Sequence, residues 1–297
     1  MTAPTVVQAL REARAQGIDR LDAQLLLAAA LGQPRSWLLA HDDVALTPPQ
    51  QRRFAAHCER RAGGEPVAYL LGEKEFHGLT LQVGPDVLVP RPDTETLVDW
   101  ALELLRQGPA RPAVLDLGTG SGAIALAIAH GHPAASVCAT DLSAAALTVA
   151  RANGERLGLA VEWLQADWWA PFAGRRFDLV LANPPYVADR DPHLAALVHE
   201  PPAALTAGAD GLAALRAISA QAGAHLRRGG WLLLEHGHDQ AAAVQAMLGN
   251  AGFGAIETRT DLGGRPRCTG GRWSRGAQGD ARQVTKRVWQ NPERSNC

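Results

Sequence analysis

The chain has 297 residues, a hydrophobic fraction of 46% and a formal net charge of −1 at pH 7. This length and apolar content predict two folded units, each able to bury a core. Nucleic-acid-binding proteins usually present a basic surface, so the near-zero charge predicts no direct nucleic-acid binding.

Cysteine spacing and the lack of targeting patterns indicate a cytoplasmic protein. The four cysteines show no CxxC or Cys/His spacing, which favours a reducing compartment and argues against a structural metal. They are Cys58, Cys138, Cys268 and Cys297. The N-terminus has no signal-peptide pattern, and no apolar run is long enough to span a bilayer, so we expect no membrane association.

The first 74 residues have helical periodicity and are predicted to form a small domain. Asp22 is expected to open a helix over residues 23–31, and Thr47, followed by Pro48, has the signature of another helix start. The titratable groups of this segment do not gather in a chemically suggestive way. We therefore expect residues 1–74 to recognise a partner rather than to catalyse a reaction.

Residues 75–91 are predicted to link this domain to the next one. The runs 79–83 and 87–89 alternate between apolar and polar residues on either side of the turn sequence Gly84-Pro85-Asp86. Alternation around such a turn is typical of a β-hairpin, so we expect these two runs to pair.

Residues 92–273 alternate between strand and helix patterns, beginning with a helix that Asp93 or Thr94 could cap. Strands are predicted at 113–117, 136–140, 161–165, 177–182 and 231–235, followed by an antiparallel pair at 255–260 and 267–273. This alternation predicts an α/β fold with a doubly wound, mostly parallel sheet. Residues 274–297 are polar and rich in arginine, and are expected to be a disordered tail.

A glycine-rich loop follows the first strand of this sheet and opens the next helix. Its residues are Gly118, Thr119, Gly120, Ser121 and Gly122. Such a loop lets the backbone approach a ligand closely at a helix N-terminus. Asp141 ends the second strand, where its carboxylate can accept hydrogen bonds from both hydroxyls of a ribose. These features suit NAD and S-adenosylmethionine equally, so a nicotinamide-dependent oxidoreductase remains an alternative.

The ends of the third and fourth strands favour S-adenosylmethionine. Asp167 can accept a hydrogen bond from an adenine amino group, Trp168 offers an aromatic wall, and Asn183 falls near the sulfur position of a methyl donor. A dehydrogenase needs an acid or base beside its hydride acceptor, commonly a histidine. We expect exposed helix-end positions for His130, His132 and His225, and structural or substrate-shaping roles for His193, His199 and His236.

The tetrapeptide Asn183-Pro184-Pro185-Tyr186 follows the unbroken apolar run of the fourth strand and is the predicted reacting centre. Its two prolines remove two backbone donors, and Pro184 keeps Asn183 out of the helical region. The sequence therefore predicts a carboxamide and a free carbonyl held in fixed directions.

Together the loop, Asp141 and this tetrapeptide resemble class I S-adenosylmethionine methyltransferases that modify planar nitrogens, either of adenine or of glutamine side chains. Residues 65–72 and 87–95 also resemble the HemK (PrmC) family, the peptide chain release factor glutamine methyltransferases. The resemblance extends to Glu75-Phe76, Asp191 to Leu194, Glu200-Pro201, Ala209 to Leu212 and Leu233 to Gly237. It covers about residues 10–273 and implies a Rossmann-like sheet with an N-terminal helical domain.

The resemblance also implies a reaction. A methyl group would pass from S-adenosylmethionine, leaving S-adenosylhomocysteine, to the amide nitrogen (N5) of the glutamine in the Gly-Gly-Gln motif of class 1 release factors, supporting translation termination. In our interpretation Asn183 and the Pro184 carbonyl accept the two amide hydrogens, Pro185 stiffens the turn, and Tyr186 packs against the amide. We expect the protein to act as a monomer.

Two departures from the family pattern bear on peptide fit. Asp93 stands where the family often has Glu, and Val198-His199 stand where it often has Arg-Phe. Three alternatives share the predicted site: a ribosomal-protein glutamine methyltransferase, an adenine methyltransferase acting on nucleic acid, and a non-catalytic binding module. The near-zero charge disfavours the adenine methyltransferase, and the intact tetrapeptide at Asn183 disfavours the binding module.

Overall fold

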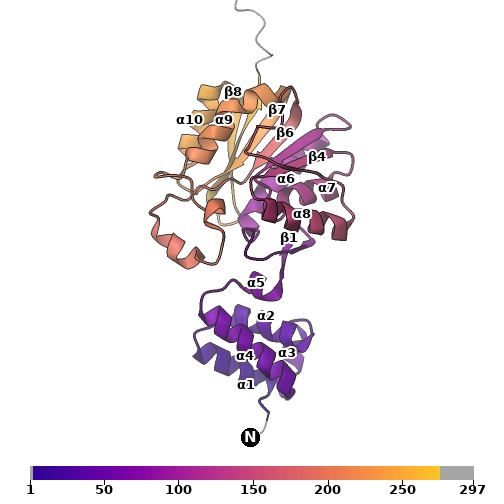
Figure 1. Ribbon diagram of the computed structural model, residues 1–297, viewed down its shortest axis with the longest axis vertical. Coiled ribbons are helices and arrows are strands. Elements are labelled where there is room, and N and C mark those ends of the chain that lie inside the picture. The colour runs from indigo at the N-terminus through magenta and orange to yellow at the C-terminus, as the bar shows by residue number, and fades with distance from the viewer. Residues whose placement is uncertain (1–2, 275–297) are drawn as a thin grey trace, which may run out of the picture.

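The computed structural model describes residues 3–274, which form a helical N-terminal unit at one end of the molecule and an α/β unit at the other (Figure 1). The helical unit contains α1 (Val6–Ala15), α2 (Arg20–Leu31), α3 (Trp37–Ala40), α4 (Pro48–Ala62) and α5 (Val67–Leu71). Its own core includes the fully buried side chains of Val6, Leu26 and Leu27. The predicted tail beyond residue 274 lies outside the described residues.

The helix starts of this unit confirm one prediction and correct another. Thr47 is the N-cap of α4, and its backbone N–H donates to Oε1 of Gln50 at 2.9 Å in a capping box. Asp22 does not open α2, because Asp19 is the N-cap and accepts from the N–H of Leu21 at 2.8 Å. Asp22 lies within the first turn, where its carboxylate pairs with Arg61 at 2.7 Å.

The predicted hairpin was placed wrongly. The structure pairs β1 (Glu73–Phe76) with β2 (Leu79–Gln82), and the turn between them is His77-Gly78, whose φ angles are 49° and 79°. Two consecutive left-handed residues match the twist of an antiparallel pair. Residues 87–89 form no strand, because flanking prolines interrupt the donors that a strand needs and the Val89 N–H donates to Oε2 of Glu200 instead.

The α/β unit confirms the predicted fold class. Its sheet has the order β5-β4-β3-β6-β7-β9-β8, parallel from β5 to β7 and antiparallel at β8 and β9. The strands are β3 (Ala113–Leu117), β4 (Ser136–Asp141), β5 (Glu162–Gln165), β6 (Phe177–Ala182), β7 (Leu226–Glu235), β8 (Phe253–Thr260) and β9 (Pro266–Trp273). The expected antiparallel closing pair is therefore present, and β7 begins earlier than predicted.

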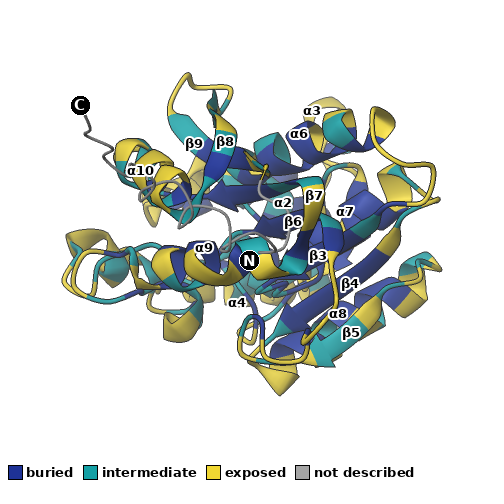
Figure 2. Cartoon of the chain, turned by 90° about the horizontal axis from the view of Figure 1, so that it is seen from above, coloured by how far each residue is buried: buried dark blue, intermediate teal, exposed yellow. Residues whose placement is uncertain are grey.

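Helices cover both faces of this sheet, and the central strands β3, β4 and β6 are mostly buried (Figure 2). One face packs against α6 (Glu95–Arg106) and α7 (Ala123–Gly131), and the other against α9 (Ala213–His225) and α10 (Ala241–Ala251). Helix α8 (Ala144–Leu157) packs beside β4 and β5. Neighbouring residues of one strand point to opposite faces, as Leu179 and Val180 do, which explains why the central strands are apolar throughout.

The start of α6 differs from the predicted capping. A short 3₁₀ turn over Pro92–Thr94 leads into α6, and Thr94 occupies the N-cap position without a capping side-chain hydrogen bond. The Asp93 carboxylate pairs with Arg267 at 3.0 Å instead. The Thr94 hydroxyl accepts from Nδ2 of Asn183, so neither polar side chain caps the helix that follows.

Gly270 marks a tight contact between β9 and its neighbours. A Cβ at this position would lie 2.3 Å from Cδ2 of Leu233 and 2.7 Å from Cη2 of Trp100. We expect Gly270→Ala to lower the free energy of unfolding by about 3 kcal/mol, since overpacking a core displaces its side chains. The matched control is Gly254→Ala in β8, where a Cβ would meet nothing within 4 Å. Equal denaturant midpoints for the two variants would contradict this account.

None of the helices formed by residues 3–274 has the length and apolar character needed to span a bilayer. Within the same residues, no group of His, Cys, Asp and Glu side chains is arranged to hold a metal ion. The described cysteines, Cys58, Cys138 and Cys268, are buried free thiols.

Candidate active site

A cavity of about 440 Å³ lies at the carboxyl ends of β3, β4 and β6. Open α/β sheets bind ligands at this edge. Its walls include Gly118, Thr119, Gly120, Ser121, Asp141, Asp167, Trp168, Asn183 and Pro185. The structure therefore brings most of the predicted site residues into one cavity. The predicted residues Gly122, Pro184 and Tyr186 adjoin these in sequence but do not line it.

A larger hollow, of about 770 Å³, lies at the opposite edge of the sheet, near the amino ends of β3, β4 and β6. It contains none of the predicted site residues, and its charged groups include the exposed ion pair between Arg175 and Glu162. The smaller cavity is the better candidate, because polar groups from several strand ends converge on it.

The glycine loop adopts a shape that only glycine accommodates easily. Gly118 and Gly120 have φ angles of 74° and 55°, in the left-handed region. A Cβ on Gly118 would lie 3.3 Å from Cζ3 of Trp168, so the missing side chain lets the indole ring approach the loop. Trp168 itself has a φ of 43°, an uncommon value for a bulky residue, at the wall of the cavity. The loop and the aromatic wall thus form one surface.

Asp141 is held in place by the backbone that surrounds it. Its Oδ2 accepts from the N–H of Gly120 at 2.8 Å, and its Oδ1 accepts from the N–H of Ser143 at 2.9 Å. Each carboxylate oxygen can accept more than one hydrogen bond. The side chain can therefore anchor the glycine loop and still accept hydrogen bonds from a ribose in the cavity.

Asp116 lies beneath the loop and is fully buried. Its Oδ2 accepts from the hydroxyl of Thr119 at 2.6 Å and from the N–H of Ala125 at 3.2 Å, while its Oδ1 has no partner among the described residues. Burial raises the pKa of this carboxyl to about 7, and the bonds from Thr119 and Ala125 oppose the rise.

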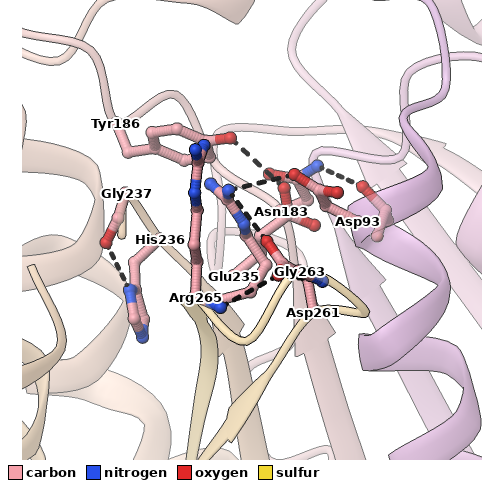
Figure 3. A network of polar contacts seen from close by, with 11 residues as sticks. Asp93, Asn183, Tyr186, Glu235, His236, Gly237, Asp261, Gly263 and Arg265 are labelled. Carbon is pink, nitrogen blue, oxygen red and sulfur yellow. Dashed lines mark hydrogen bonds and ion pairs between the residues drawn. The ribbon is translucent and has the colours of Figure 1, made fainter. Parts of the chain in front are cut away.

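Asn183 follows the last residue of β6 and lines the cavity beside Pro185. Its Nδ2 donates to Oγ1 of Thr94 at 3.2 Å, and Figure 3 shows Asn183 within this network of polar contacts. Thr94 is only 4% exposed and also lines the cavity. Because one N–H of the Asn183 amide donates to Thr94, the carboxamide is held in one orientation, and its oxygen, which accepts no hydrogen bond from the described residues, can accept one from a ligand.

Tyr186 is fixed by both its backbone and its hydroxyl. Its carbonyl accepts from Nε2 of Gln240 at 3.0 Å. Its hydroxyl donates to Oε1 of Glu235 at 3.3 Å (Figure 3). Burial raises the pKa of the tyrosine hydroxyl above its usual value, so the hydroxyl keeps its proton. Tyr186 therefore connects the predicted reacting centre to a buried carboxylate.

Glu235 is a site residue that residue-by-residue analysis of the sequence missed. It ends β7, is completely buried, and its Oε2 has no hydrogen-bond partner among residues 3–274. Burial raises the pKa of its carboxyl to about 7, while the Thr94 hydroxyl and the charge of Arg267 oppose the rise. Its position at the end of a predicted strand could have indicated a role in the site, because buried carboxylates are often found at functional sites.

The segment of residues 86–91, which we call the strap, lines one side of the cavity. Glu200, which is 3% exposed, accepts from the N–H of Val89 at 3.0 Å and forms an ion pair with Arg91. The hydroxyl of Tyr69 donates to the carbonyl of Val87 at 2.5 Å, so the helical unit also holds this strap. These contacts join residues that are far apart in the chain, and no local sequence pattern predicts them.

None of the six histidines considered above lines the cavity. His193 is exposed beside Asp191, and Nε2 of His199 lies 3.0 Å from the Gly63 carbonyl. His236 is buried, with Nε2 2.7 Å from Oγ1 of Thr269. His225 is half-buried against Trp169, with ring centroids 4.8 Å apart, and His132 is also half-buried, so both differ from the exposed positions that we expected.

The raised pKa values of Asp116 and Glu235 predict that stability falls as pH rises toward 7. Their ordinary values are 3.8 and 4.5, so between about pH 4 and 7 the native state holds protons that the unfolded chain has released. For Asp116 alone this corresponds to at most about 4 kcal/mol above pH 7. Denaturant unfolding at several pH values should show a smaller decline for Asp116→Asn than for the wild type. Equal declines would contradict the raised pKa of Asp116.

Comparison with known proteins identifies the family. Residues 5–72 match the model of the PrmC N-terminal domain, and residues 95–210 match that of the methyltransferase small domain. The release factor glutamine methyltransferase of Bordetella pertussis is 50% identical over 258 residues, which are 86% of this chain and 95% of that protein. The chain belongs to the release factor glutamine methyltransferase family.

Other comparisons agree. The release factor glutamine methyltransferase of Xylella fastidiosa is 50% identical over 267 residues, 89% of this chain and 97% of that protein. A solved structure of the T. thermophilus 16S rRNA N2 G1207 methyltransferase, in complex with AdoMet and guanosine, aligns with a TM-score of 0.51 and 22% identity. That alignment covers 68% of this chain and 50% of the other, and it supports the class I methyltransferase fold.

Proposed function

We propose that this protein transfers a methyl group from S-adenosylmethionine to the side-chain amide nitrogen (N5) of the glutamine in the Gly-Gly-Gln motif of class 1 release factors. Family membership supports this substrate. The main structural support for this reaction is the hydrogen bond from Asn183 to Thr94, which leaves the Asn183 oxygen as an acceptor at the cavity. An acceptor there suits a substrate that presents an NH₂ group.

The cavity residues fit the cofactor. Asp141 would accept hydrogen bonds from the ribose, and the glycine loop with Gly118 and Gly120 would let the cofactor approach the backbone closely. Asp167 would accept from the adenine amino group, and Trp168 would pack against its ring. When bound, this cofactor supplies a methyl group activated by its positively charged sulfur.

Asn183 and Pro184 would hold the substrate amide. An amide nitrogen is a poor nucleophile because its lone pair is delocalised, so positioning has to supply much of the rate, and orientation can contribute ~7–11 kcal/mol. The Asn183 oxygen and the Pro184 carbonyl, which accepts no hydrogen bond from the described residues, accept the two amide hydrogens. These acceptors stabilise positive charge that develops on the nitrogen, which then releases one proton to water.

Pro185 and Tyr186 complete this amide site. Pro185 restricts the backbone beside the cavity. In this proposal the Tyr186 ring, which is anchored through its hydroxyl to Glu235 and follows the cavity residue Pro185 in sequence, packs against the planar amide of the bound substrate.

The helical unit of residues 1–74 would recognise the release factor, with residues 75–91 as a linker and residues 92–273 as the methyltransferase domain. The hydrogen bond from Tyr69 to the strap at Val87 supports this assignment of roles, because it connects the helical unit to a segment that lines the cavity. The protein would act as a monomer and would need no direct contact with nucleic acid.

Incubation with isotope-labelled S-adenosylmethionine tests the proposal. A purified class 1 release factor should gain one methyl group, located by peptide mass on the Gly-Gly-Gln glutamine. A release factor with Gly-Gly-Ala in place of that motif is the matched control and should stay unlabelled. Label on a ribosomal protein or on DNA, with none on the release factor, would refute the proposed substrate.

A further inference from the structure

The cavity contains one cationic side chain among several carboxylates. The charged side chains that line it are Asp86, Arg91, Asp141 and Asp167. Among the described residues that line the cavity, Arg91 is therefore the only one with a positive charge. The cofactor contacts proposed above use Asp141 and Asp167 and give Arg91 no role. A cation at the wall of a cavity attracts an anionic group of a ligand.

A buried carboxylate holds Arg91 in place. Glu200, which is only 3% exposed, pairs through Oε1 with Nη2 of Arg91 and accepts from the Val89 N–H through Oε2 at 3.0 Å. The Arg91 side chain is 37% exposed, and its Nε and Nη1 groups donate to none of the described residues. A guanidinium has five N–H donors in a planar fork, so Arg91 can bind a second carboxylate while it keeps its bond to Glu200.

The order of the strands indicates which part of the cofactor lies near Arg91. Asp167 follows β5, Asp141 ends β4 and Asn183 follows β6, and the sheet order is β5-β4-β3-β6. A cofactor with adenine at Asp167 and ribose at Asp141 therefore has its sulfur toward Asn183. The Arg91 carbonyl accepts from the Thr94 N–H at 3.1 Å, and the Thr94 hydroxyl accepts from Asn183 at 3.2 Å. Arg91 thus belongs to the same end of the cavity as Asn183.

We propose that Arg91, held by Glu200, binds the α-carboxylate in the methionine part of S-adenosylmethionine. This part of the cofactor extends from the sulfur away from the ribose, so it lies at the end of the cavity where Arg91 supplies the positive charge. Without Arg91, the carboxylate would share the cavity with the three aspartates that line it, and like charges repel each other. The inference rests on the proposed function for its cofactor, and not on the identity of the methylated glutamine.

Calorimetric binding of two ligands tests this role. Decarboxylated S-adenosylmethionine differs from S-adenosylmethionine only in lacking the α-carboxylate. Arg91→Gln should weaken binding of S-adenosylmethionine about 30-fold and should not weaken binding of the decarboxylated ligand. Arg91→Lys keeps the charge but not the planar fork, so its loss should be smaller. Arg227→Gln is the matched control, because Arg227 also pairs with a carboxylate, that of Asp178, but lies outside the cavity lining.

The double variant Arg91→Gln/Glu200→Gln separates binding from folding. Removing Arg91 alone leaves Glu200 buried without its cation, which can destabilise the strap. The double variant removes both charges and keeps an acceptor for the Val89 N–H, and we expect the same loss of about 30-fold for S-adenosylmethionine. Recovery of binding in the double variant, an equal loss for both ligands, or no loss in Arg91→Gln would overturn the inference. Wild-type protein that binds S-adenosylmethionine but labels no glutamine would instead refute the proposed function, so the two failures are distinguishable.

Discussion

Asn183→Ala is expected to reduce kcat by about 10²–10³-fold while changing the affinity for S-adenosylmethionine by less than about threefold. The side chain lines the cavity at the end of β6, and its oxygen is free to accept because its nitrogen donates to Thr94. Alanine removes one of the two acceptors proposed for the substrate amide. The remaining Pro184 carbonyl would leave the NH₂ group free to rotate away from the direction of attack.

Turnover on the release factor and calorimetric binding of S-adenosylmethionine separate these two effects. Asn250→Ala is the matched control, because Asn250 is exposed at the end of α10 and lies outside the cavity. We expect that control to behave as wild type in both assays. A variant at Asn183 that retained near-normal turnover would rule out the amide-holding mechanism. Loss of cofactor binding would point instead to a role in the cofactor site.

Much of the fold followed from local patterns in the sequence. Strands such as 113–117 and 177–182 were predicted with their observed ends, because central parallel strands are continuous apolar runs between turn residues. The hairpin was misplaced because Gly84-Pro85-Asp86 has strong turn chemistry, whereas the turn that forms is His77-Gly78, with a non-glycine residue at positive φ. Tertiary contacts determine which of the two turns forms, and these contacts cannot be inferred from the alternation of apolar and polar residues.

The candidate site likewise contains residues that the sequence locates and residues that only the structure brings together. The glycine loop, Asp141 and Asn183 lie at strand ends whose order fixes their meeting place, so a sequence motif locates them in space. Thr94 and Glu235 meet Asn183 and Tyr186 only because α6 packs against the sheet and β7 pairs with β6. The strand-end position of Glu235 indicates at most a site residue, and no local pattern indicates which residue either side chain contacts. Contacts between residues far apart in the chain are therefore the part of the site that could be found only from the structure.

Asp141→Ala is expected to weaken S-adenosylmethionine binding by about 10²-fold. The carboxylate has two tasks: Oδ2 holds the N–H of Gly120, and both oxygens would accept hydrogen bonds from the ribose. Hydrogen bonds to a charged group contribute about 1.5–3 kcal/mol each, so losing two of them corresponds to at least this decrease. Alanine also leaves the Gly120 N–H without its acceptor.

Asp141→Asn separates the two tasks in the same calorimetric titration. Its amide oxygen can still accept from Gly120. Its NH₂ group replaces the oxygen that accepts from the Ser143 N–H and can only donate to a ribose hydroxyl, so we expect an affinity between those of wild type and alanine. Glu155→Ala removes an exposed carboxylate from α8, away from the cavity, and should bind as wild type. If Asp141→Ala bound the cofactor within about threefold of wild type, the ribose would have to be held by other groups.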